Sequence, residues 1–136
     1  MFSRREIVKK IKEYFDQGIT FNQETTLCGA SIIQNIKLAK SLGYKIELPY
    51  VGVASVEIAK KRIAYRVSQG GHGIPDADVE RRYTESFNCL KEIIGLCDLA
   101  VLYDNTDCFN RFAIYQKGKL FDVADNRPDW YNELNI

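Results

Sequence analysis

Four arginines surround a glycine-rich turn near the middle of the chain, and their side chains are suited to bind an anion. They are Arg62, Arg66, Arg81 and Arg82, in the stretch RIAYRVSQGGHGIPDADVERR that also contains the single histidine, His72. A guanidinium group binds phosphate through two parallel hydrogen bonds, and arginines stabilise a phosphoryl group during its transfer. We therefore expect residues 62–82 to form a lid-like arm that closes over a phosphate.

A simpler interpretation of these arginines stays open, because helix-surface arginines often pair with nearby acids. Candidate partners in the same region are Glu57, Asp76, Asp78, Glu80 and Glu85. Arg62 and Arg66 lie one helical turn apart, so both can address one target. His72 can donate a hydrogen bond to an anion, whereas a lone histidine in a turn is more often structural than catalytic.

Polar residues at two predicted strand ends form a second group of candidates. Glu24, Thr25 and Thr26 offer a carboxylate and two hydroxyls that can hydrogen-bond a polyhydroxylated substrate, and the glutamate can orient an attacking hydroxyl. The alternative is that the threonines only cap the following turn. Asp104 and Asn105 follow another strand, where they form a turn or contact a nucleotide.

Hydrophobic periodicity predicts the elements that would position these residues. Helical stripes predict helices at residues 4–17, 31–42, 56–68 and 75–96. Apolar or alternating segments predict strands at residues 19–25, 45–53, 99–103, 112–116 and 119–123. The last two strands are expected to form a C-terminal β-hairpin turning at Lys117-Gly118, and the tail with Trp130 and Tyr131 to fold back on the body.

Alternating strands and helices predict an α/β fold with a parallel sheet flanked by helices. The working residues of such sheets gather at the carboxyl ends of the strands. With 136 residues, the chain is expected to be one domain over residues 1–136.

Composition excludes several classes of function. The net charge of +1 gives no reason to expect binding to nucleic acid or to a membrane. No apolar run approaches the roughly 18 residues that cross a bilayer, and the charged N-terminus does not resemble a signal peptide, so we expect a cytoplasmic protein. The cysteines are Cys28, Cys89, Cys97 and Cys108. They form no CxxC pair and one histidine does not complete a usual zinc site, so we expect reduced thiols and no metal ligands.

Three stretches together resemble the zeta-toxin family of P-loop kinases, in particular its bacterial branch of predicted ABC-type ATPases. They are FNQETTLCG, AKSLGYKIELPYVGVASVEIAKKRIAYRVSQGGHGIPDADVERRYTESFNCL and LAVLYDN, in the order of the family. The resemblance implies a nucleoside-kinase-like fold, ATP and Mg²⁺ as cofactors, and phosphoryl transfer to a hydroxyl of a small acceptor. In characterised members this acceptor is the sugar nucleotide UDP-N-acetylglucosamine. An antitoxin is a further partner that the resemblance leaves open.

The resemblance also assigns roles to individual residues. Glu24 and Thr26 match the acceptor-binding Glu-x-Thr of the family. Arg66 matches a lid arginine that stabilises the transferred phosphoryl group, which makes it the candidate catalytic residue. The remaining lid residues match less specifically and are Arg62, His72, Arg81 and Arg82.

The chain departs from this family at the phosphate-binding loop. Members begin with a strand and a GxxxxGK(S/T) loop followed by a catalytic aspartate, and this chain contains no such motif. That loop and its metal supply most of the electrostatic stabilisation of phosphoryl transfer. We therefore expect a domain that is truncated at its N-terminus, related to kinases and inactive on its own.

The missing strand would lie between residues 19–25 and 45–53. Either these two strands pair directly, or another chain fills the gap, or the sequence is a fragment of a longer protein. Two functions without catalysis also stay open. One is a remnant that binds an anionic ligand, and the other is an interaction module that self-associates through an exposed sheet edge.

Overall fold

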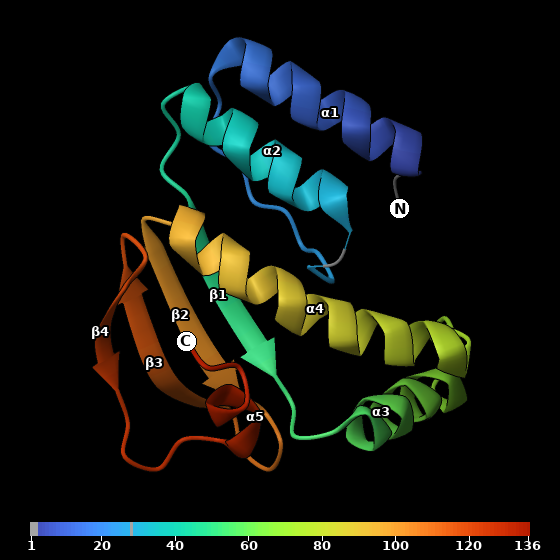
Figure 1. Ribbon diagram of the computed structural model, residues 1–136. Coiled ribbons are helices and arrows are strands. Elements are labelled where there is room, and N and C mark those ends of the chain that lie inside the picture. Colours follow the sequence, from blue (N-terminus) through green and yellow to red (C-terminus); the bar gives the residue numbers. More distant parts are fainter. Residues whose placement is uncertain (1–2, 28) are drawn as a thin grey trace.

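The computed structural model describes residues 3–27 and 29–136, which form five helices and four strands (Figure 1). In chain order they are α1 (Arg4–Gln17), α2 (Ala30–Ser41), β1 (Glu47–Gly52), α3 (Val56–Ser68), α4 (Asp76–Leu96), β2 (Leu99–Asp104), β3 (Asn110–Gln116), β4 (Lys119–Val123) and α5 (Asp129–Asn132). The four predicted helices are confirmed. The short helix α5 was not predicted, although the expected packing of the tail on the body is confirmed by the burial of Trp130 and Tyr131.

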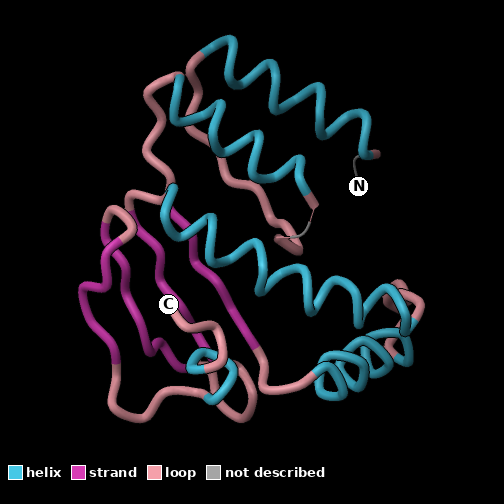
Figure 2. Tube along the Cα trace, viewed as in Figure 1, coloured by secondary structure: helices cyan, strands magenta, loops and turns pink. Residues whose placement is uncertain are grey.

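The strands form one mixed sheet in the order β1-β2-β3-β4 (Figure 2). β1 and β2 are parallel and are joined through α3 and α4, whereas β2, β3 and β4 run antiparallel to their neighbours. The α/β class and the C-terminal hairpin are therefore confirmed, and the expected parallel sheet is not. The reason is connection length: residues 105–109 and the Lys117-Gly118 turn are too short for the crossover that parallel strands require.

The predicted strand at residues 19–25 is absent, because residues 19–27 form neither helix nor strand. Aromatic packing holds this segment to α1 and to the connection between α2 and β1 instead. The Phe21 ring lies 5.1 Å from that of Tyr14 and 6.2 Å from that of Tyr44. The Tyr44 hydroxyl lies within hydrogen-bonding distance of the carbonyl oxygens of Tyr14, at 3.0 Å, and Ile19, at 2.9 Å. Of the three alternatives for the missing strand, direct pairing of this segment with β1 is therefore excluded.

Local signals explain where the helices begin and end. α1 starts with a capping box, in which the Ser3 hydroxyl accepts from the Glu6 amide and the Glu6 carboxylate accepts from the Ser3 amide. Gly18 ends this helix in the left-handed region, at φ 66°. The Ser55 hydroxyl caps α3 as its sequence position predicts.

The core lies between α4, α5 and one face of the sheet. Its completely buried side chains include Leu90 and Ile93 from α4 and Leu102 from the centre of β2. Trp130 of α5 closes this core, and its ring stacks on Phe87 at 5.4 Å. This packing also fixes the position of α4 relative to β1. Both elements contribute residues to the core and to a hollow at the carboxyl end of β1.

No helix within residues 3–27 and 29–136 has the length and apolar character needed to cross a membrane. The cytoplasmic location stays a prediction. Cys89, Cys97 and Cys108 are free thiols, whereas Cys28 lies outside the described residues.

Candidate functional site

A hollow of about 250 Å³ lies at the carboxyl end of β1, between α3 and α4. Thr26, Arg66 and Arg82 all line it. They come from three separate parts of the chain: the segment before α2, the last turn of α3 and the second turn of α4. The structure thus brings together three of the seven residues that the sequence singles out.

Helical spacing explains why α4 presents a polar group to this hollow. Val79, Arg82, Tyr83 and Ser86 recur at intervals of three and four residues and line the hollow from one face of the helix. The same face continues to Phe87, which packs against Trp130 in the core. Arg82 therefore extends from the apolar stripe of α4.

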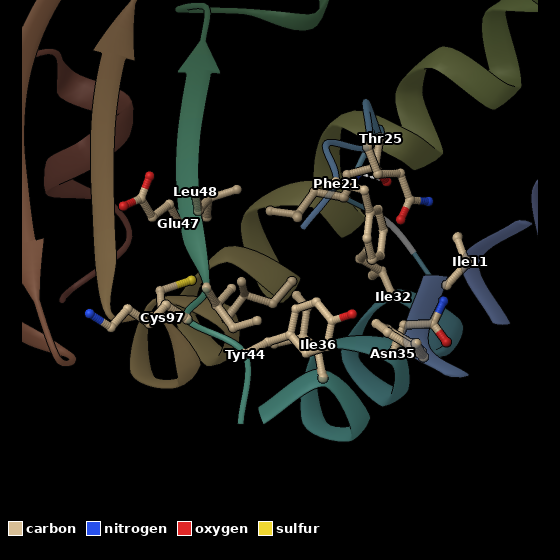
Figure 3. Close-up of a pocket in the computed structure, with 17 residues that line it drawn as sticks. Ile11, Phe21, Thr25, Ile32, Asn35, Ile36, Tyr44, Glu47, Leu48 and Cys97 are labelled. Atoms are coloured by element: carbon tan, nitrogen blue, oxygen red, sulfur yellow. Dashed lines mark hydrogen bonds between the residues drawn. The ribbon is translucent and has the colours of Figure 1, made fainter. Parts of the chain in front are cut away.

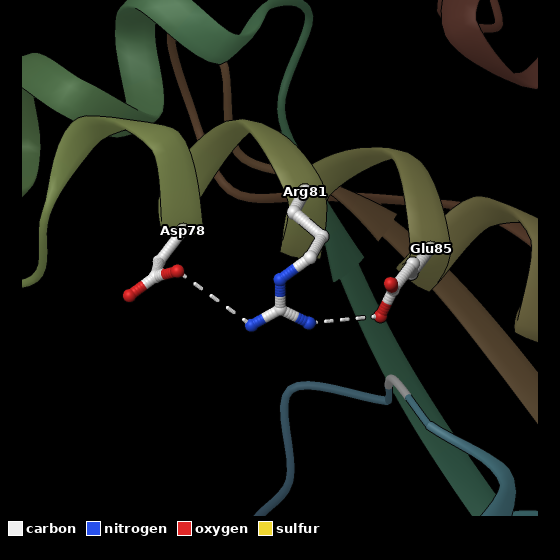
Figure 4. A network of polar contacts seen from close by, with 3 residues as sticks. All are labelled: Asp78, Arg81 and Glu85. Carbon is white, nitrogen blue, oxygen red and sulfur yellow. Dashed lines mark hydrogen bonds and ion pairs between the residues drawn. The ribbon is translucent and has the colours of Figure 1, made fainter.

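The two arginines of the hollow differ from the neighbouring Arg81 in their ion pairing. Within residues 3–27 and 29–136, neither Arg66 nor Arg82 makes an ion pair. The adjacent Arg81 differs: its guanidinium lies 3.8 Å from the Asp78 carboxylate and 3.2 Å from the Glu85 carboxylate (Figure 4). Ion pairing on the helix surface therefore describes Arg81, whereas the guanidinium groups of Arg66 and Arg82 remain available to a ligand.

Tyrosine and serine hydroxyls complete the polar lining, and the sequence interpretation missed them. The Tyr50 hydroxyl and the Ser86 hydroxyl share a hydrogen bond of 2.7 Å, and the Tyr83 hydroxyl donates to the Val53 carbonyl at 3.0 Å. Burial raises the pKa of Tyr50 to about 12 and also raises the pKa of Tyr83. Both phenols stay protonated at neutral pH, so they serve as hydrogen-bonding groups and not as bases. The sequence does contain one signal for Ser86: it lies four residues after Arg82, which places both side chains on the same face of α4.

The other four predicted site residues do not line this hollow. Arg62 lines a neighbouring depression with Arg66, and its Nη2 atom donates to the Thr106 carbonyl at 2.7 Å. Arg81 is held by its two carboxylates. His72 and Glu24 are exposed, in the turn between α3 and α4 and in the segment before α2 respectively. Residues 62–82 are thus two packed helices joined by a short turn, with Arg62 hydrogen-bonded to the loop after β2.

Asp104 has a structural role at the end of β2. Its Oδ1 atom accepts hydrogen bonds from the Thr106 hydroxyl at 2.7 Å and from the Trp130 indole at 3.0 Å. The Thr106 hydroxyl in turn accepts from the Ala54 amide at 3.0 Å. This network joins the ends of β1 and β2 to α5, which favours the turn interpretation of Asp104 and Asn105 over nucleotide contact.

A second cavity, of about 160 Å³, lies among α1, α2, α4 and β1 (Figure 3). Its lining is mainly apolar and includes Ile11, Phe21 and Ile36. The Thr25 hydroxyl accepts from the Leu27 amide at 3.1 Å, so Thr25 caps the local turn as the simpler interpretation predicted. This cavity offers no cationic cluster for an anion.

Among residues 3–27 and 29–136, no group of three or more histidines, cysteines, aspartates or glutamates is placed to hold a metal ion. The described residues likewise contain no GxxxxGK(S/T) loop that would cradle the phosphates of ATP. The residues present therefore do not fit a Mg²⁺–ATP complex held by this chain alone.

Comparison with known proteins finds a relative that is itself described as uncharacterized. A curated protein of Haemophilus influenzae (strain ATCC 51907 / DSM 11121 / KW20 / Rd), described as an uncharacterized protein, is 48% identical over 67 residues. The match covers 49% of this chain and 48% of the relative, so it spans about half the length of each protein. No family model matches the chain, and no solved structure matches it significantly. The zeta-toxin resemblance and the kinase chemistry that it implies stay predictions.

Proposed function

We propose that the hollow between α3 and α4 binds the phosphate-bearing part of a small ligand such as a UDP-sugar. The chain would then be the acceptor-binding part of a zeta-toxin-like phosphotransferase. The observation that supports this proposal is the presence of two guanidinium groups without ion-pair partners, Arg66 and Arg82, around one hollow.

The charge of the lining favours an anion over a neutral or cationic ligand. The described residues that line the hollow include these two arginines and no aspartate or glutamate. Because Arg66 and Arg82 lie on different helices, they can approach a phosphate from two sides, and each can donate two parallel hydrogen bonds. The hydroxyl groups of Thr26 and Ser86 lie in the same lining and suit the sugar or phosphate oxygens.

The size of the hollow limits how much of the ligand it encloses. Sites that enclose a drug-sized ligand have volumes of about 300–1,000 Å³, and this hollow has about 250 Å³. It therefore accommodates a phosphate with part of a sugar, and the remainder of a sugar nucleotide would lie outside.

We propose that this chain on its own binds the ligand and does not catalyse phosphoryl transfer. The groups that bind ATP and Mg²⁺ in P-loop kinases are the backbone amides and lysine of the phosphate loop, and this chain has no such loop. Arg66 and Arg82 would bind the phosphate of the acceptor, and Thr26 would contact its hydroxyl groups. Transfer of a phosphoryl group would require a phosphate loop from outside residues 1–136.

Isothermal titration with UDP-N-acetylglucosamine, UDP and uridine tests this proposal. We expect the two phosphorylated compounds to bind and uridine to give no heat. Because a hydrogen bond to a charged group contributes about 1.5–3 kcal/mol, we expect R66A and R82A each to weaken UDP binding by roughly 10- to 100-fold. R81A is the matched control, since it removes the adjacent arginine that is already paired with two carboxylates.

Three results would contradict the proposal. The first is the absence of heat with both phosphorylated compounds, and the second is uridine binding as strong as that of UDP. The third is a loss in R81A equal to the loss in R82A, since that would indicate a general charge effect. Incubation with Mg²⁺–ATP and UDP-N-acetylglucosamine addresses catalysis separately, and phosphoryl transfer by the unmodified chain would contradict the expected inactivity.

A further inference from the structure

Among the residues that the structure describes, no helix packs on one face of the sheet. The side chains of Tyr50, Leu102 and Ala113 share one row of the sheet and belong to the core that includes residues of α4 and α5. Side chains alternate between the two faces along a strand, so the intervening residues lie on the opposite face. These are Glu47, Pro49, Val51, Leu99, Val101, Tyr103, Ile114 and Gln116, and none of them is buried. Pairing adds three charged residues to the same face, because Arg111 pairs with Tyr103, Asp122 with Ile114 and Lys119 with Gln116. We call this surface the open face.

The centre of the open face is apolar. Pairing places Pro49 beside Val101, and Val101 beside Ile114, so that these three side chains form one row across β1, β2 and β3. The Phe109 ring stacks on Tyr103 at 4.7 Å while 59% of Phe109 stays exposed. Parallel strands that are apolar on both faces are typical of sheets covered on both faces.

The total surface of the chain indicates how much cover is missing. The chain exposes 9470 Å², whereas a compact monomer of 15.6 kDa exposes about 7,250 Å² by the scaling of monomeric proteins. The surplus is about 2,200 Å², within the range of about 1,000–2,500 Å² that each subunit of an obligate homodimer buries. This surplus belongs to the whole chain, and the open face contributes one part of it, so the chain has surface to spare for a contact with a second copy.

The charges at the rim of the open face identify a second copy as a suitable occupant. One row of the sheet runs from Glu47 through Leu99 and Gln116 to Lys119, so an acid stands at one edge strand and a base at the other. A twofold axis parallel to the strands places β1 of one copy over β4 of the second copy. Glu47 then faces Lys119 of the second copy at both ends of the row. In the next row Val101 faces Ile114 of the second copy, and Pro49 faces Asp122 at the rim.

The edge of β1 is a less suitable surface for self-association than the face. Pro49 has no amide hydrogen to donate from this edge, and the Tyr83 hydroxyl already bonds the Val53 carbonyl at its end. Proline and occupied edge groups are common means of preventing strand addition. The open face is therefore a more suitable surface for self-association than the exposed sheet edge considered from the sequence.

We propose that two copies of this chain pack their open faces together as an aligned β-sandwich, with strands crossing at about 30°. The proposal does not rest on ligand binding, because Arg66 and Arg82 lie on α3 and α4, outside the open face. Val51 borders both surfaces, so association is measured without ligand.

Analytical ultracentrifugation over a range of protein concentrations tests this interface. We expect the wild-type chain to sediment with twice the mass of 15.6 kDa. Val51→Lys places a charge on the open face, and we expect it to raise the dissociation constant at least about 10-fold, because an unpaired buried charge is costly. The matched control is Val67→Lys on α3, since Val67 is 45% exposed and Val51 is 48% exposed. Circular dichroism verifies that both variants are folded.

Charge reversal tests the arrangement of the two copies. E47K and K119E each create like-charge contacts at both ends of the row, so we expect each to weaken the dimer by roughly 10-fold. The double variant restores opposite charges and is expected to recover wild-type association to within about 3-fold. A wild-type chain that stays monomeric at all concentrations would overturn the proposal. A dimer that is weakened equally by V51K and V67K, or that is not recovered in the double variant, would assign self-association to another surface.

Discussion

The indole ring of Trp130 lies directly against the backbone of Gly52. A Cβ atom added to Gly52 would stand 2.5 Å from Cζ2 of this ring and 2.8 Å from two of its other carbons. Gly52 is the last residue of β1 and Trp130 belongs to α5, so this contact closes the end of the sheet next to the hollow. The hydrogen bond from the Trp130 indole to Asp104 fixes the ring in that position.

We predict that Gly52→Ala destabilises the fold, because neither the buried ring nor the paired strand can move away from the added methyl group. Overpacking of this kind costs about 1–3 kcal/mol of unfolding free energy. Gly95→Ala in α4 is the control, since a Cβ atom there meets nothing within 4 Å. Gly95 is the second-to-last residue of α4, so replacing it with alanine should leave the stability unchanged or raise it by at most about 0.5–1 kcal/mol.

Urea denaturation of the two glycine variants measures both changes. Equal stability of G52A and the wild-type chain would show that the Trp130 ring has room to shift. In that case α5 would be more loosely packed than its buried side chains indicate.

The buried phenol of Tyr50 predicts a loss of stability at alkaline pH. Burial raises its pKa from 10.0 to about 12, although the hydrogen bond with Ser86 acts in the opposite direction. A raised pKa in the folded state stabilises the fold below pH 10, and this contribution is lost as the pH rises from 10 through about 12. The loss from Tyr50 should reach about 1 kcal/mol at pH 11.

Denaturation of Y50F between pH 8 and pH 11 isolates this contribution. Y50F should be less stable than the wild-type chain at pH 8, because the Ser86 hydroxyl loses its partner, and its stability should fall less steeply above pH 10. Burial also raises the pKa of Cys97 to about 11, so both proteins keep a decline that begins near pH 9. Tyr65→Phe, which alters an exposed ring, should follow the wild-type profile. Identical slopes for Y50F and the wild-type chain would contradict the assignment.

Local patterns predicted most of the elements of this fold. These elements depend on residues that lie close together in the sequence. Examples are the caps at Ser3 and Ser55, the turn at Lys117-Gly118 and the apolar stripe of α4. Sheet order depends on contacts between distant segments and was predicted less well. Residues 19–25 alternate like a strand, yet Phe21 finds aromatic partners on α1 and beside β1, and those contacts override the local preference.

Only part of the candidate site could be predicted from the sequence, namely the arginines that stand out by their charge and clustering. Clustering singled out Arg66 and Arg82 as candidate anion ligands, and spacing alone did not separate Arg82 from its neighbour Arg81. The difference arises from helix geometry, because Arg81 lies within reach of Asp78 and Glu85 while Arg82 turns toward the hollow. Tyr50 was not identified because its position in the hollow depends on how β1 packs against α4.

The accessibility of the thiols predicts their order of reaction. Cys108 is exposed, whereas Cys97 is buried and has a pKa raised chiefly by desolvation. Since the thiolate is the reactive form, we expect iodoacetamide at pH 8 to label Cys108 at least about 100-fold faster than Cys97. Peptide mapping by mass spectrometry at successive times measures each site separately. Rapid labelling of Cys97 in the folded chain would show that the end of α4 opens to solvent.

The turn after α3 contacts the backbone of Arg66, so a substitution in this turn should affect ligand binding. The Gly71 amide donates to the Arg66 carbonyl at 2.7 Å, and a Cβ atom on Gly71 would stand 2.9 Å from that oxygen. Gly71→Ala must therefore displace the backbone of the residue that we propose as a phosphate ligand. At Gly73 the added atom would meet only the Val67 side chain, at 3.3 Å, which can move more easily.

We expect G71A to weaken UDP binding by roughly 3- to 10-fold, since a displacement of Arg66 lengthens its hydrogen bonds to phosphate. The unfolding free energy of G71A should fall by about 1–2 kcal/mol, and G73A should change both quantities much less. Titration with UDP together with urea denaturation separates the two effects. If G71A lost stability while UDP binding stayed unchanged, Arg66 would not be held in its binding position by this turn. If G73A weakened binding as much as G71A, flexibility of the whole turn would determine affinity instead of the contact between Gly71 and Arg66.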